Sequence, residues 1–237
     1  VDVIVVTAMA AAMAANSASN TTPIVITGGD PVALGLVTSL ARPGGNVTGL
    51  SGLYELNSKR LEILRDAVPK LARVGFLRQL GAGIAIDLQL KEVRPAALAL
   101  KVKLEEIETQ FDAKDLESAF QTAKQKQVNA IMTQTGPRFF AERKRIVELA
   151  SKYRLPAIYF RTEFTYEGGL MPYGGDYVDL YERAAIYVDK ILKGAKPADL
   201  PVQQAMKFEF IINLKAAKQI GLTIPPSVLA RADRVIR

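Results

Sequence analysis

The sequence predicts an α/β protein in which helices cover both faces of parallel sheets. Short apolar segments alternate along the chain with longer segments whose apolar residues recur every three or four positions. This alternation is typical of parallel sheets, which are buried on both faces. At 237 residues, the chain is long enough for one large domain or for two lobes of ordinary size.

In the first part of the chain, apolar runs predict strands at residues 1–6, 23–27 and 47–50. Helices are predicted at residues 8–18, 32–40 and 58–68. The helix at 32–40 follows two glycines, with Asp30 at the N-cap position and Pro31 at the first helical position. A glycine doublet permits a sharp turn there, or a close approach of the backbone to a ligand. Residues 42–45 are interpreted as a structural turn.

The remainder of the chain continues the same alternation. Strands are predicted at residues 73–77, 102–108, 130–133, 156–159 and 170–173. Helices are predicted at 86–100, 114–126, 139–153 and 177–192. Pro95 predicts a kink or break in the first of these helices, and Gly194 ends the last one.

The composition excludes several kinds of chemistry. The chain has no Cys and no His, which excludes disulfides, thiol nucleophiles, Cys/His zinc sites and Ser-His-Asp triads. Phosphate-binding glycine motifs are missing as well. The net charge of +7 comes from cations scattered along the predicted helices, which favours solvated faces over a nucleic-acid groove. We therefore expect no catalytic residue, no metal, no cofactor and no nucleic-acid partner.

A small-molecule site in such sheets lies outside the carboxyl ends of the strands. Thr7 follows the first strand, and the free N–H groups at positions 8–10 suit a carboxylate. The alternative is that Thr7 only caps its own helix, and the two roles are compatible. Other polar residues at strand ends are Arg78, Gln79, Gln134 and Thr135.

A second group of residues gathers near the ends of two later strands. Arginine for a carboxylate, an acid for an amine and tyrosine for stacking would fit a zwitterion or an aromatic acid. Taken singly, each charge is more often solvated or part of a salt bridge. Glu163 with Glu167 or Asp176 could form an acid/base pair, but no nucleophile or metal cluster accompanies them, so we expect no enzyme. The group comprises Tyr159, Arg161, Glu163, Tyr173 and Asp176.

Four long segments resemble the substrate-binding proteins of ABC transporters, of the kind related to tryptophan- and tyrosine-binding receptors. The most characteristic is GDPVALGLVTSLARPGGNVTGLS at residues 29–51. The start, VDVIVVTAMAAAMAA, agrees with it. So do RLPAIYFRTEFTYEGGLMPYGGDYVDLYERAAIYVDKILKGAKPADLPV (154–202) and KFEFIINLKAAKQIGLTIPPSVLARADRVI (207–236).

The resemblance implies a type I periplasmic-binding-protein architecture, with two Rossmann-like lobes and a ligand in the cleft between them. By analogy, the first lobe comprises residues 1–70 and 173–203, and the second comprises 71–172 and 204–237. Crossovers are expected near residues 70, 173 and 203. Thr7 and the amides that follow it, at Ala8 and Met9, are then expected to bind a carboxylate, and Gly29 and Asp30 to shape the same end of the site at the rim of the first lobe. Gln134 and Thr135 would add hydrogen bonds from the second lobe, Tyr159 and Tyr173 would pack on the ligand, and Arg161, Glu163 or Asp176 would complete charge pairing.

Two features depart from the family pattern. Members usually begin with a signal or lipoprotein peptide and two further strand–helix units, each about 30 residues or more. These segments are absent from this sequence, which predicts an incomplete first lobe with an exposed sheet edge. A monomer is expected for the full-length protein, and a dimer or an element swap is possible for this shorter chain. Arg78 and Gln79 also stand where members commonly have an Asn-Pro turn.

The resemblance implies a periplasmic or otherwise extracytoplasmic receptor that delivers its ligand to an ABC permease in the membrane. The ligand would be a small carboxylate: an amino acid, aromatic or branched, or an aromatic acid. The alternative is a ligand-sensing module of a regulator with the same fold. A hydrolase or transferase is the third hypothesis, and the absence of His and Cys disfavours it.

Overall fold

The computed structural model of the protein describes residues 1–51, 56–81, 83–111, 113–204 and 207–237. The chain forms two compact units, each built from two separate stretches. Unit 1 comprises Val1–Tyr54 and Gly175–Phe208, and unit 2 comprises Glu55–Gly174 and Glu209–Arg237. The chain therefore passes from one unit to the other three times.

The first crossing differs most from the sequence-based boundaries, which lay near residues 70, 173 and 203. The chain leaves unit 1 after residue 54, so helix α2 (Leu56–Ala67) belongs to unit 2. The reason is packing: Leu61, Leu64 and Ala67 are buried in the same core cluster as strand residues of unit 2. The second and third crossings lie after residues 174 and 208.

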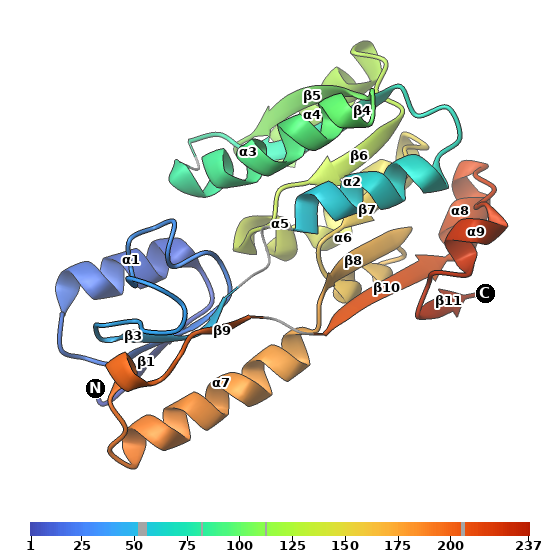
Figure 1. Cartoon of the computed structure of the whole chain (residues 1–237). Helices are drawn as coiled ribbons and strands as arrows, with labels where there is room; N and C mark the ends of the chain where they lie inside the picture. Colours follow the sequence, from blue (N-terminus) through green and yellow to red (C-terminus); the bar gives the residue numbers. More distant parts are fainter. Residues whose placement is uncertain (52–55, 82, 112, 205–206) are drawn as a thin grey trace. The chain divides into compact units, whose positions relative to one another are not determined.

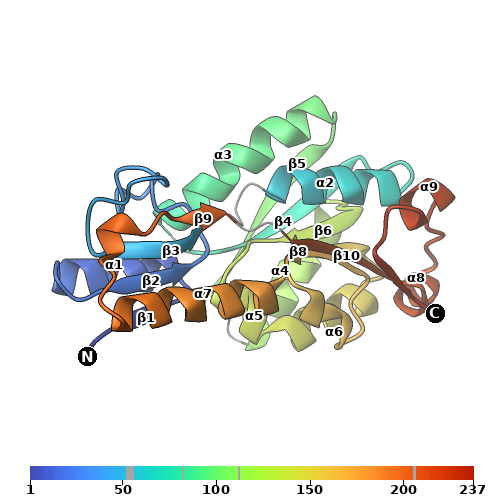
Figure 2. The ribbon, with the colours of Figure 1, turned by 60° about the horizontal axis from the view of Figure 1, so that its bottom comes forward.

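Unit 1 is a parallel sheet with helices on both faces. Its strand order is β1-β2-β3-β9, with β1 at Ile4–Val6, β2 at Ile24–Thr27, β3 at Val47–Ser51 and β9 at Gln203–Gln204. Helices α1 (Met9–Ala18) and α7 (Tyr177–Leu192) lie on opposite faces of this sheet (Figures 1 and 2). On the α1 face, Ile24 and Ile26 of β2 pack into the core that includes Met9 and Ala12 of α1.

The helix predicted at residues 32–40 is wrong. The predicted cap at Asp30 is present, because its Oδ1 accepts the N–H groups of Val32 and Ala33 at 3.1 and 2.9 Å. The turn that begins there ends at Gly35, whose φ of +67° lies in the left-handed region. Thr38 closes the following loop by donating from its hydroxyl to the Arg42 carbonyl at 2.7 Å. The segment is therefore a turn, although Leu36 and Val37 keep the buried positions that suggested a helix.

Unit 2 is a larger sheet whose described strand pairings are parallel. Its strand order is β11-β10-β8-β7-β6-β4-β5. The strands are β4 (Arg73–Gln79), β5 (Lys103–Thr109), β6 (Ala130–Thr133), β7 (Ala157–Tyr159), β8 (Met171–Gly175), β10 (Phe208–Asn213) and β11 (Arg234–Ile236). Besides α2, the helices are α3 (Ile84–Ala99), α4 (Ala113–Gln125), α5 (Pro137–Ala141), α6 (Arg143–Lys152), α8 (Leu214–Ile220) and α9 (Pro226–Leu229).

The sheet of unit 2 separates two apolar cores. Ala130 and Met132 of β6 pack with residues of α2 and α3, whereas Ile131 packs with residues of α4 and α6. This alternation follows from the strand geometry, in which successive side chains point to opposite faces. Of the kink or break predicted at Pro95, the break is absent, because α3 continues through that residue. The helix predicted at 139–153 is divided into α5 and α6 at Glu142.

A matched pair of glycine substitutions tests the turn that follows β2. Gly29 has a φ of +81°, and a Cβ added there would lie 2.3 Å from Cγ of Met9. Gly35 has a similar φ of +67°, but no atom would lie within 4 Å of an added Cβ. We expect Gly35→Ala to cost about 1–2 kcal/mol from backbone strain alone. Gly29→Ala should cost at least about 1 kcal/mol more, because Met9 must also move.

Urea unfolding of both variants, monitored by circular dichroism, measures this difference. Equal losses of unfolding free energy would contradict the close packing of Met9 on Gly29.

Candidate functional site

In unit 1, the loops after β1 and β2 meet at the carboxyl edge of the sheet. The two strands are neighbours, with Val6 opposite Ile26. The predicted site residues Thr7, Ala8, Met9, Gly29 and Asp30 follow these strands directly. A Cβ added at Gly29 would lie 2.3 Å from Cγ of Met9, so the turn after β2 packs closely against the start of α1. The structure therefore brings this part of the predicted site together.

The first turn of α1 is open at this edge. Ala8 is the N-cap residue, with extended backbone (φ −115°, ψ 132°), and no side chain caps the helix. The alternative role of Thr7 as the cap of this helix is therefore wrong. The first N–H groups of a helix have no partner within the helix, so they are available to an anion. Thr7 itself is exposed beside them.

The side chains of Asp30 and Asp176 both accept hydrogen bonds from backbone N–H groups two and three residues further along the chain. Asp30 caps the turn described above, and Asp176 caps α7 by accepting the N–H groups of Val178 and Asp179 at 2.9 and 3.2 Å. The Asp176 N–H also donates to the Lys207 carbonyl at 3.0 Å. These bonds give both carboxylates a structural role that is independent of any ligand.

In unit 2, Arg78 is neutralised by the neighbouring strand. Glu108 lies directly opposite it in the β4–β5 register and forms an ion pair with it. Glu106 lies 3.1 Å from its Nε. Because two carboxylates of β5 pair with it, Arg78 has a structural role at the carboxyl end of β4.

The side chain of Gln134 connects the ends of two strands. The side-chain Oε1 accepts the backbone N–H of Gln79 at 2.8 Å. The backbone N–H of Gln134 donates to the Leu77 carbonyl, also at 2.8 Å. Because Gln134 is 4% exposed, its side chain is part of the sheet end. The structure brings Gln79 and Gln134 together, as the sequence predicts, through a bond between them.

Arg161 and Glu163 pair with each other. The Arg161 Nε donates to Glu163 Oε2 at 3.1 Å, and a second contact joins its Nη2 to Oε1. The guanidinium also lies 4.0 Å from the ring centroid of Phe140. The two charges that the sequence analysis assigned to opposite ends of a zwitterion therefore compensate each other.

Tyr159 and Tyr173 are not brought together. Tyr159 is 1% exposed and stacks on Phe164, with 4.4 Å between ring centroids, in the core that faces α4 and α6. Tyr173 packs against the other core and meets Phe210 edge to face. The two rings serve opposite faces of the sheet, so they do not form a common wall for one ligand.

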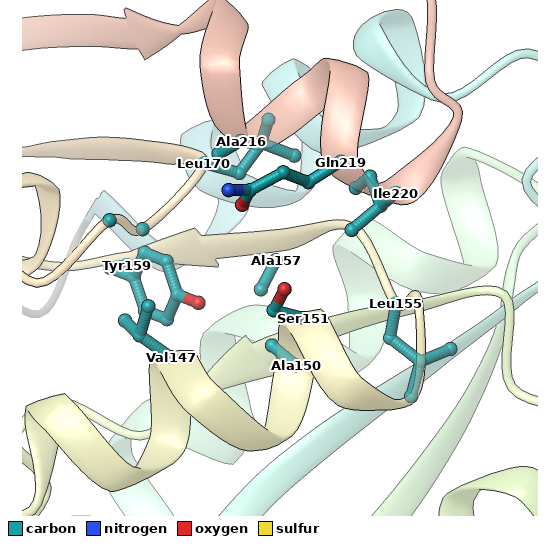
Figure 3. A pocket seen from close by; sticks show the side chains of 12 residues that line it. Val147, Ala150, Ser151, Leu155, Ala157, Tyr159, Leu170, Ala216, Gln219 and Ile220 are labelled. Carbon is teal, nitrogen blue, oxygen red and sulfur yellow. The ribbon is translucent and has the colours of Figure 1, made fainter.

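The Tyr159 hydroxyl points into a small cavity between α6 and α8 (Figure 3). The cavity measures about 20 Å³, which is room for one water molecule. Burial raises the pKa of this hydroxyl, so it stays protonated. Ser151 and Gln219 also line the cavity, and their polar groups could share such a water. The cavity is therefore too small for an amino acid.

The strongest polar feature of unit 2 is a buried network around Arg60 that the sequence analysis missed. Arg60 is 1% exposed. Its Nη1 donates to Asn57 Oδ1 at 2.9 Å and to Thr135 Oγ1 at 3.0 Å, and its Nε donates to the Tyr173 carbonyl at 2.7 Å. A signal existed, because Asn57 and Arg60 precede Leu61 and Leu64 on one helical face and so occupy core-facing positions.

Glu92 of α3 completes the charge balance of this network. Its Oε1 accepts the Ser58 N–H at 2.9 Å. Burial raises the pKa of the Glu92 carboxyl, and the nearby Arg60 charge opposes that rise. The carboxylate thus reduces the cost of burying the Arg60 guanidinium.

Two further observations concern metal binding and membrane-spanning helices. Across the residues that the structure describes, no cluster of His, Cys, Asp and Glu is arranged to hold a metal ion. No helix in the same residues combines the length and apolar character needed to cross a membrane.

The fold and the polar residues at its strand ends define a two-unit α/β protein of the type I periplasmic-binding-protein class. Residues 1–236 match the family model of ABC transporter substrate binding proteins. The chain therefore belongs to that family, whose members bind solutes, and the predicted fold class is confirmed.

Individual relatives agree with this assignment. The tyrosine-binding protein of Clostridioides difficile (strain R20291) is 26% identical over 225 residues, covering 93% of this chain and 63% of that protein. The chain thus spans less than two thirds of the length of this curated relative. A solved domain protein from Vibrio cholerae is 32% identical, with a TM-score of 0.88 over 99% of this chain and 78% of its own. An ABC domain from Streptococcus pneumonia in complex with L-Trp is 28% identical, with a TM-score of 0.86 over 99% and 81%.

The raised pKa of Glu92 predicts a distinct pH dependence. A carboxyl whose pKa is higher in the folded state binds more protons there, so its contribution to stability is present below its ordinary value of 4.5. That contribution is lost as the pH rises through the folded-state pKa. Glu92→Gln cannot titrate, so the difference in unfolding free energy between variant and wild type should shift in favour of the variant above pH 4.5.

Urea unfolding between pH 4 and pH 7 (about the range in which carboxyls titrate) measures that difference. Glu62→Gln is the control, because the Glu62 side chain on α2 is 46% exposed and pairs with Lys59. A pH-independent difference for Glu92→Gln would contradict a buried carboxyl at this position.

Proposed function

We propose that the protein is the solute-binding component of an ABC importer and carries a small carboxylate ligand, in the first instance an aromatic amino acid. Membership of the family over residues 1–236 is the observation that carries the proposal. Two relatives support the ligand class, since one is named for tyrosine binding and another was solved with L-Trp. An extracytoplasmic location is part of the same proposal.

The proposed mechanism is differential binding. Ligand contacts from loops of both units would stabilise one conformation of the protein, and a membrane permease would recognise that conformation. The division of the chain into two compact units supports such a mechanism, because closure of separate units around a ligand is a common conformational response.

The proposed ligand contacts follow from which polar groups the protein leaves available. In unit 1, the open first turn of α1 beside Thr7 and Gly29 suits a carboxylate. In unit 2, Thr135 lies half-buried at the end of β6. Arg78 and Arg161 contribute less than the sequence suggested, because carboxylates of this chain already pair with them.

A thermal-shift screen over the twenty amino acids and a set of aromatic acids tests the ligand class, with calorimetry on each hit. The expected result is a raised midpoint with L-tryptophan or L-tyrosine, since a ligand that binds only the folded state stabilises it. A response confined to sugars or cations would contradict a carboxylate receptor.

A charge placed at residue 7 tests the contact in unit 1. Thr7→Glu puts a carboxylate beside the first turn of α1, where it would compete with the ligand for the same N–H groups. We expect its dissociation constant for the amino acid to rise about tenfold, a change of about 1.4 kcal/mol. Thr7→Gln is the matched control, because glutamine has the shape of glutamate without its charge. Its dissociation constant should stay close to that of the wild type.

Calorimetric titration of both variants gives the two dissociation constants. Equal affinities for Thr7→Glu and Thr7→Gln would remove the α1 terminus from the proposed site.

A further inference from the structure

We infer that Arg60 is a positioning residue of the ligand site: it fixes the Thr135 hydroxyl so that its proton is directed toward an acceptor atom of the ligand, such as a carboxylate oxygen. This inference rests on the proposed function and deepens it. It names the group in unit 2 that distinguishes a carboxylate from a neutral or cationic group.

The first step concerns where Arg60 holds the protein together. From its place on α2, its guanidinium donates to Asn57 of the same helix, to Thr135 in the loop after β6 and to the carbonyl of Tyr173 on β8. The donors of this planar group have a fixed geometry, so three bonds in different directions define its orientation. Arg60 therefore holds the β6 loop in register with the end of β8, just before the chain crosses to unit 1.

The second step concerns the backbone of Thr135. The side chain of Gln89, which is 0% exposed, accepts the Thr135 N–H at 2.8 Å and donates to the Thr135 carbonyl at 3.1 Å. Both main-chain groups of Thr135 are thus held by one buried amide. The residue has a defined backbone position before any ligand arrives, which lowers the entropic cost of binding.

The third step concerns the direction of the hydroxyl proton. A guanidinium can only donate, so Thr135 Oγ1 must accept the bond from Arg60. Its own proton then points to another acceptor. Within the described residues, Thr135 Oγ1 donates no hydrogen bond, and the residue is only half-buried at the carboxyl end of β6. The hydroxyl is consequently set as a donor.

The fourth step concerns which ligand group this donor selects. A hydroxyl that accepts from a cation becomes a stronger donor, because hydrogen bonds in a chain polarise one another. An anionic oxygen is therefore the preferred acceptor, and a ligand ammonium group is disfavoured beside the Arg60 charge. Glu92 compensates part of that charge from the α3 side.

Calorimetry on the full chain tests the inference with L-tryptophan, L-tyrosine and L-tryptophanamide as probes. Thr135→Val removes the hydroxyl and should weaken binding of the amino acids about tenfold or more, as expected for a hydrogen bond to a charged group. Thr135→Ser keeps the hydroxyl and should remain within about threefold of wild type. The loss in Thr135→Val should be smaller for the amide, which lacks the anionic oxygen.

Arg60→Lys separates positioning from mere stability. Lysine keeps the charge but cannot make the same three bonds, so we expect about a fivefold loss of affinity. The double variant Arg60→Lys/Thr135→Val should bind no more weakly than Thr135→Val alone, because both changes remove the same interaction. The control is Thr48→Val in β3, which loses a buried hydroxyl bond to the Leu200 carbonyl (2.6 Å) and should keep wild-type affinity.

Urea unfolding of each variant shows whether it is folded at the temperature of the titration. Unchanged affinity in Thr135→Val, or losses in the double variant that simply add, would overturn the positioning role while leaving the proposed function intact. A wild-type protein that binds neither amino acid would contradict the proposed function itself. If Arg60→Lys does not fold, the contrast between Thr135→Val and Thr135→Ser still decides the question.

Discussion

The buried cation Arg60 is the constraint on which the sheet of unit 2 depends at the carboxyl ends of its strands. Arg60 is almost completely removed from water, and a charge in that position is tolerated only when hydrogen bonds and an opposite charge compensate it. The protein supplies these from Asn57, Thr135, the Tyr173 carbonyl and the nearby Glu92. Removing one of the neutral partners would leave a buried donor unsatisfied, and removing Glu92 would leave the charge less compensated, so these segments are ordered together. These hydrogen bonds add to the apolar packing that places α2 in unit 2.

Much of the fold could be predicted from the sequence because the periodicity of apolar residues is strong in both units. The α7 helix and the β6 strand agree with prediction at both ends. The failure at residues 32–40 has a physical cause: the apolar spacing is helical, but Gly35 is left-handed after a single turn and the loop closes through Thr38. Apolar spacing reports which side chains are buried, and either a helix or a turn can bury them.

The candidate site was harder to predict, because residue type does not reveal which charges the protein uses for itself. Arg78 on β4 pairs with Glu106 and Glu108 on β5. The residues next to Arg78 in the sequence do not indicate these partners. Tyr159 is an aromatic residue at a strand end, yet it points into a core. In contrast, Thr7, Met9 and Gly29 come together because they follow neighbouring strands, and strand order is the part of topology that alternation predicts. The useful signal for Arg60 was a polar residue at an apolar position of α2.

The most direct test of this account is hydrogen exchange at the amide of Thr135, measured by NMR in wild type and in Arg60→Lys. In the wild type, this amide should be protected, because it donates to the buried side chain of Gln89. In Arg60→Lys, its exchange should be at least about tenfold faster, while Ile131 and Met132 in β6 keep their protection as internal references. Equal exchange of the Thr135 amide in the two proteins would contradict the claim that Arg60 orders this end of the sheet.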